Sequence, residues 1–177
     1  MKNFLVIFFL PLMFASCSKR SEDKVDNPEK FIYQVYYNAD MMDDKGPEYG
    51  TYNNAMKDKF KELGIDKPYD ESPYANVFNQ YLEDIDNAQR RTGDILGFDW
   101  DILWETQDGV VDFGFEITKT EIFPAAIIET QWNNGSTKTF FLIQEEGKWK
   151  ILDMVYKNDF VETDYLIQAK EILKDIR

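Results

Sequence analysis

The C-terminal half of the chain carries a strand-and-turn pattern that constrains the fold more than any other feature. Apolar and polar residues alternate from Val111 to Thr118, as in a strand with one buried face. The tetrapeptide Asn-Asn-Gly-Ser at residues 133–136 suits a hairpin turn, and Gly147 marks a second tight turn. The apolar run at 140–143 predicts a central strand covered on both faces. Together these signals predict a meander of antiparallel strands over residues 111–118, 123–132, 137–146 and 148–156.

The N-terminal half carries helical signals instead. Asn27-Pro28 and Ser72-Pro73 have the cap-then-proline order that is typical of helix starts, and Gly64 is a typical helix end. Because helices precede the strands, the order predicts an α+β fold, with N-terminal helices packed on a curved antiparallel sheet and a closing C-terminal helix. The expected helices run from Asn27 to about Gly46, from Thr51 to Gly64, from Ser72 to about Gly93, and from about Glu162 onward.

The first 16 residues have the features of a bacterial export signal. Lys2 is followed by an apolar run at residues 4–14, which is shorter than the 20 or so residues that span a bilayer. The residues Ala15-Ser16-Cys17 then resemble the lipobox of bacterial lipoproteins, although Phe14 replaces the usual leucine. The resemblance implies that Cys17 carries fatty acids such as palmitate and becomes the new N-terminus. The alternative is an ordinary cleaved signal peptide with an incidental cysteine.

These features predict three regions. Residues 1–16 form the lipoprotein signal peptide, residues 17–26 form a flexible polar tether, and residues 27–177 form a single α+β domain. Ser18 follows the cysteine, and the sorting rule of such lipoproteins then implies the outer membrane, facing the periplasm. We therefore expect a lipid-anchored protein of the bacterial cell envelope.

Charge and composition exclude several kinds of function. The formal net charge is −13, so the surface repels nucleic acid; it attracts a basic protein partner or serves solubility alone. The chain has no histidine, which removes Ser-His-Asp and Cys-His catalysis and histidine-bound metals. It also has no glycine-rich phosphate loop. We expect no cofactor, and any catalysis would depend on carboxylates, lysine or tyrosine.

The segment GFDWDILWETQDG, residues 97–109, is the densest group of polar and aromatic side chains. Its first aspartates begin like an EF-hand loop, but Leu103 and Trp104 occupy positions that such a loop reserves for a ligand and glycine. The favoured interpretation is a structural corner in which aspartates cap turns and tryptophans pack. A calcium site, a catalytic carboxylate pair and a rim for a ligand or partner remain alternatives. The candidate rim residues are Asp99, Trp100, Asp101, Trp104, Gln107 and Asp108.

Two parts of the chain resemble a known superfamily. The segment EEGKWKILDM is similar to the last hairpin of the nuclear-transport-factor-like, or cystatin-like, superfamily. The segment FDWDILWETQD resembles the D-x-D, then Q-D, motif of a family of secreted bacterial domains within it, which has no assigned reaction. The resemblance implies a cone-like sheet whose mouth borders this segment. The matching positions are Asp99, Asp101, Gln107, Asp108, Trp149, Ile151 and Asp153.

The expected function is binding without catalysis, to a protein or a small ligand at the mouth of the cone. One version is an immunity protein that neutralises a basic toxin. The alternative is a small carboxylate-dependent hydrolase or isomerase that uses the same cavity. The many tyrosines of the helical half either line a sugar-binding pocket or pack with the hydroxyl at the surface. They are Tyr33, Tyr36, Tyr37, Tyr49, Tyr52, Tyr69 and Tyr74.

Overall fold

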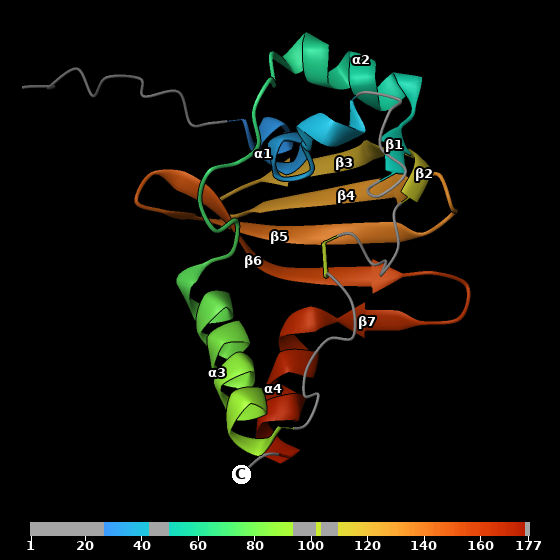
Figure 1. Ribbon diagram of the computed structural model, residues 1–177. Helices are drawn as coiled ribbons and strands as arrows, with labels where there is room; N and C mark the ends of the chain where they lie inside the picture. The colour runs from blue at the N-terminus through green and yellow to red at the C-terminus, as the bar shows by residue number, and fades with distance from the viewer. Residues whose placement is uncertain (1–26, 43–49, 94–101, 104–109, 176–177) are drawn as a thin grey trace, which may run out of the picture.

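A computed structural model of the chain describes residues 27–42, 50–93, 102–103 and 110–175. These residues form an α+β fold, as predicted, in which five antiparallel strands follow one another in the order of the chain (Figure 1). The helical elements are α1 (Pro28–Val35), the 3-10 helix η1 (Ala39–Met41), α2 (Asn54–Leu63), α3 (Asn76–Thr92) and α4 (Tyr165–Asp175). The large sheet contains β3 (Phe115–Ile122), β4 (Ala126–Trp132), β5 (Thr137–Glu145), β6 (Lys148–Lys157) and β7 (Glu162–Asp164). A small parallel sheet joins β1 (Gly50–Tyr52) to β2 (Val110–Phe113).

The predicted strand at residues 111–118 is divided into β2 and β3, which belong to different sheets. The division falls at Gly114, where a Cβ atom would overlap with the side chain of Asn53. Asn53 holds this position because its backbone N–H donates to Phe113 O at 2.9 Å, while its side chain caps α2. The absence of a side chain at Gly114 therefore lets the start of α2 pack against the chain between the sheets.

The first helix is much shorter than the expected span from Asn27 to Gly46. Asn27 caps α1 as predicted, but the helix ends at Val35. The hydroxyl of Tyr52 donates to the carbonyl of Tyr36 and accepts from the backbone N–H of Asn38, which fixes a non-helical turn. The Asn38 side chain then caps η1. Helical spacing alone did not reveal this tertiary contact.

Three other helix starts also differ from the prediction. Thr51 lies in β1, and α2 begins only after its cap, Asn53. Residues 73–75 form a parallel bridge with Ile151 of β6, so α3 begins at Asn76 rather than at Ser72. Residues 162–164 pair with β6 as β7, so the closing helix begins at Tyr165. In each case backbone pairing with a strand replaces the first helical turn.

The hydrophobic core lies between α1 and one face of the large sheet, here called the inner face. Along β4, every second side chain from Ala126 to Trp132 is buried. The neighbouring β5 buries Phe140 and Leu142 but leaves Phe141 and Ile143 partly exposed. The prediction that residues 140–143 are covered on both faces is therefore wrong.

The helices do not all cover the sheet. Figure 1 shows α1 lying across the sheet, whereas α3 and α4 lie side by side beyond β6 and β7, at the β7 edge of the sheet. Their contact buries Ile85 and Ala88 of α3 and Ala169 of α4. No helix within the described part of the chain is long and apolar enough to cross a membrane.

Candidate functional site

The predicted site and lipidation residues are mostly outside the described part of the chain. Cys17 and the six candidate rim residues, Asp99, Trp100, Asp101, Trp104, Gln107 and Asp108, all lie outside it. The structure does describe Ile102 and Leu103, at the centre of the predicted block. Ile102 is buried in the core, and Leu103 packs against it.

A buried lysine binds this pair of residues to the inner face of the sheet. Lys138 of β5 is 1% exposed. Its Nζ donates to Leu103 O at 2.8 Å, to Ile102 O at 3.1 Å and to the Tyr36 hydroxyl at 3.4 Å. Three acceptors match the three N–H groups of a lysine ammonium. The amine therefore anchors the centre of the predicted block to the core.

The surroundings of Lys138 are polar and aromatic at once. Its Nζ lies 4.7 Å from the ring centroid of Trp132, a cation–π arrangement. The Trp132 indole N–H donates to the Thr130 hydroxyl, which donates in turn to the Lys138 carbonyl, both at 2.9 Å. The Tyr36 hydroxyl donates to Leu103 O at 2.9 Å. This network organises the core, and no sequence motif indicated it.

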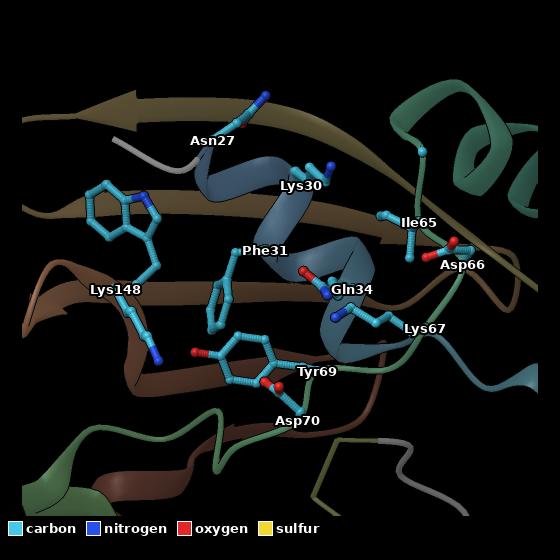
Figure 2. Close-up of a pocket in the computed structure, with 12 residues that line it drawn as sticks. Asn27, Lys30, Phe31, Gln34, Ile65, Asp66, Lys67, Tyr69, Asp70 and Lys148 are labelled. Atoms are coloured by element: carbon cyan, nitrogen blue, oxygen red, sulfur yellow. The ribbon is translucent and has the colours of Figure 1, made fainter. Parts of the chain in front are cut away.

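A pocket of about 350 Å³ lies on another side of α1, between that helix, the segment after α2 and the start of β6 (Figure 2). We call it the α1–β6 pocket. Its volume is within the usual range for small-ligand sites. Its aromatic lining comes from Phe31, Tyr69 and Trp149, of which Phe31 and Trp149 are almost fully buried. The polar and charged lining residues are Asn27, Lys30, Gln34, Asp66, Lys67, Asp70 and Lys148.

Tyr69 is the most unusual residue of the pocket. Its hydroxyl oxygen is buried, yet it has no hydrogen-bond partner in the described structure. The ring contacts Phe31 edge-on at 5.1 Å between centroids, and the Lys150 amine lies 5.1 Å from the ring centroid. Figure 2 shows the hydroxyl directed along the pocket toward Lys148. An unsatisfied buried hydroxyl is costly, and a ligand hydroxyl or carboxylate would satisfy it.

The charged lining of the pocket consists of three lysines, Lys30, Lys67 and Lys148, and two aspartates, Asp66 and Asp70. Lys148 binds Glu71, and this hydrogen bond lowers the pKa of the Glu71 carboxyl and raises the pKa of the Lys148 amine. Lys30 and Lys67 form no ion pair with another described residue. Figure 2 shows the Lys67 amine close to the Gln34 amide at one side of the pocket. Two lysines are thus available to an anionic ligand.

The sequence reasoning missed this pocket, apart from including Tyr69 among the tyrosines of a possible sugar site. Three other tyrosines of that set, Tyr33, Tyr36 and Tyr52, belong to the buried core, and Tyr49 lies outside the described residues. A signal was present in the alternation Lys148, Trp149, Lys150. It places two lysines on the face opposite to a buried tryptophan. Nothing in the sequence shows that residues 65–71 pack beside this strand.

The acidic side chains of the described residues were candidates for a metal site or for carboxylate chemistry. No group of three or more Asp, Glu, His or Cys side chains there is arranged to hold a metal ion. Burial raises the pKa of the Asp153 carboxyl, but this group accepts hydrogen bonds from the backbone N–H groups of Leu166 and Met154. Asp153 therefore caps α4, a structural role.

No protein-family model, curated protein or solved structure matches this chain. The resemblance to the nuclear-transport-factor-like superfamily and the lipobox assignment therefore stay predictions. What the molecule itself defines is an α+β fold with an aromatic-lined pocket whose charged lining residues are three lysines and two aspartates.

Proposed function

We propose that this protein is a non-catalytic, lipid-anchored envelope protein that binds a small ligand with an anionic group in the α1–β6 pocket. The observation that carries the proposal is the buried Tyr69 hydroxyl without a partner, in a pocket that Lys30 and Lys67 also line. Hydroxyl, amide and aromatic groups together suit a polyhydroxylated molecule, and the lysines suit its negative charge. An acidic monosaccharide is the simplest molecule of this kind.

The proposal also includes the predicted cone-like architecture and the predicted location at the outer membrane. The five-stranded sheet with α1 on its inner face is compatible with a cone-like, cystatin-like domain. In that arrangement the predicted rim residues would border the mouth of the cone, and Lys138 holds Ile102 and Leu103, which lie between them in the sequence. Lipidation at Cys17 would place the domain at the outer membrane, facing the periplasm.

Two alternatives are distinguishable from this proposal. Neutralisation of a basic toxin is supported by the net charge of −13 but by no described surface feature. Carboxylate catalysis would require two acids at a defined separation in a shared cavity. Asp66 and Asp70 line the pocket, but both are exposed. Binding therefore explains the pocket better than catalysis does.

The test is calorimetric titration of the chain, at low ionic strength, with glucuronate, succinate and phosphate, each compared with glucose. At least one anion should bind more tightly than glucose. Lys67→Gln should weaken that binding by about five- to tenfold, because one charge-assisted hydrogen bond is lost. The matched control is Lys174→Gln on α4, which replaces an exposed lysine far from the pocket. Binding of no anion in preference to glucose, or equal losses in both variants, would refute the proposal.

A further inference from the structure

The turn between β3 and β4 exposes an unusual amount of apolar surface. Phe123 is 92% exposed and Ile122 is 57% exposed, and Pro124 beside them is also exposed. A hydrogen bond of 2.7 Å from Phe123 N to Ala125 O closes the turn. The two apolar side chains are thus held at the tip of a regular hairpin, here called the β3–β4 tip.

The β3–β4 tip lies near the point where the domain begins. The hydroxyl of Thr120, on β3, donates to the Glu29 carboxylate at 2.6 Å, and Glu29 is the second residue of α1. The Glu29 backbone N–H donates to the Asn27 side chain. The first described residue therefore lies at the same end of the sheet as Ile122 and Phe123.

The length of chain between Cys17 and this point is short. Ten residue steps separate Cys17 from Asn27, and an extended chain covers at most about 3.5 Å per step. A lipid attached to Cys17 would therefore lie within roughly 35 Å of the start of α1. Membrane anchoring at Cys17 therefore keeps this end of the domain within reach of the bilayer.

We propose that the β3–β4 tip inserts Ile122 and Phe123 into the bilayer surface beside the lipid anchor. The binding partner of this exposed apolar tip is thus the surface of a lipid bilayer. The inference rests on lipidation of Cys17 and is independent of what the α1–β6 pocket binds. A second apolar contact beside the lipid anchor fixes one orientation of the domain at the bilayer surface.

The charges beside the tip indicate which kind of surface it fits. Lys119, the nearest lysine along β3, forms ion pairs with Glu121 at 2.9 Å and Glu129 at 3.2 Å. The hydrogen bonds that the Lys119 amine donates to these carboxylates raise the pKa of the amine. Because this cation is already paired, the contact is hydrophobic, and it suits a zwitterionic surface rather than an anionic one.

A second exposed phenylalanine provides an internal control. Phe160, in the turn between β6 and β7, is also 92% exposed and is followed by the exposed Val161. The strand register places it at the opposite end of the sheet, because Lys157 pairs with Thr137 and Phe115 pairs with Trp132. Phe160 therefore has the same exposure as Phe123 without proximity to the anchor.

The experiment uses the full-length lipidated chain in phosphatidylcholine vesicles, with lipidation checked by mass. Cys17 is the only cysteine, and its thiol is consumed by lipidation, so one new cysteine can be labelled specifically. A fluorophore is attached in Pro124→Cys or, as the control, in Asp159→Cys, next to Phe160. The label at 124 should be quenched by nitroxide-bearing lipids and protected from aqueous iodide. The label at 159 should not be quenched by nitroxide-bearing lipids, and it should be quenched by aqueous iodide.

A second variant tests the phenylalanine itself. Phe123→Ser in the Pro124→Cys background should shift the insertion equilibrium about tenfold toward the exposed state, because a large apolar side chain is lost. Phe160→Ser in the same background should have no effect. Equal iodide quenching at 124 and 159, an unchanged response to Phe123→Ser, or the absence of fatty acid on Cys17 would overturn the proposal.

Discussion

The buried amine of Lys138 gives the most informative single substitution, Lys138→Met. Methionine has nearly the same length and keeps the apolar stem, but it cannot donate to the carbonyls of Ile102 and Leu103. These acceptors lie 3.1 and 2.8 Å from Nζ in the wild type. The substitution therefore removes the attachment of the 102–103 segment to the inner face while leaving the sheet filled.

The magnitude follows from the contacts that are lost. A hydrogen bond to a charged group contributes about 1.5–3 kcal/mol, and buried acceptors without donors add a penalty. Removing a buried charge from the core offsets part of this loss. We expect the free energy of unfolding to fall by about 2–4 kcal/mol, and the melting temperature to fall by roughly 5–15 °C for a domain of this size.

The assay is urea unfolding of wild type and variant at the same pH, with proteolysis of the native state as a second readout. Cleavage near Ile102 and Leu103 should accelerate, because the Lys138 amine no longer holds these residues. The control is Lys119→Met, the same change at a lysine of the same sheet whose side chain is 49% exposed. It should cost less than about 1 kcal/mol. A Lys138→Met variant as stable as wild type, with unchanged cleavage, would refute the reasoning.

Three further substitutions test other parts of the fold. Trp149→Ala should cost about 3–5 kcal/mol, measured by urea unfolding, because Trp149 is only 2% exposed; a melting temperature within two degrees of wild type would contradict its packing. Tyr52→Phe should cost about 1–3 kcal/mol, because Tyr36 O and Asn38 N–H lose their shared partner; a loss below about 0.5 kcal/mol would contradict this role. Asp153→Asn keeps an acceptor for Leu166 N–H, whereas Asp153→Ala should cost about 0.5–2 kcal/mol. Because burial raises the pKa of Asp153 above 3.8, wild type should lose stability relative to Asp153→Asn as pH rises from about 3 to 6, and thermal melts showing the opposite trend would refute the assignment.

The α+β class and the hairpins were predictable because their signals are local. Positive φ angles at Gly135 and Gly147 are met by glycine in short turns. The buried face of β5 was not predicted correctly, because the apolar run at 140–143 conceals the alternation of burial, to which Lys138 also belongs.

Helix lengths and the pocket depended on contacts between distant segments. The turn after Val35 is fixed by Tyr52, and the start of α3 is delayed by pairing with Ile151. The α1–β6 pocket likewise requires the segment from Ile65 to Asp70 to pack between α1 and Lys148. Contacts between segments that are far apart in the chain leave no periodic signal in the sequence. Within each segment, the residues that make these contacts have ordinary spacing.

The central claim, that the α1–β6 pocket binds a small anionic molecule, is tested most directly by mapping amide chemical shifts during titration with the tightest-binding anion. Binding in the pocket should give the largest changes at Gln34, Lys67 and Tyr69, with little change along α4. Tyr69→Phe should reduce the affinity by about three- to tenfold, since the hydroxyl that the ligand satisfies is gone. Shift changes absent from these residues, or spread evenly over the surface, would contradict the claim.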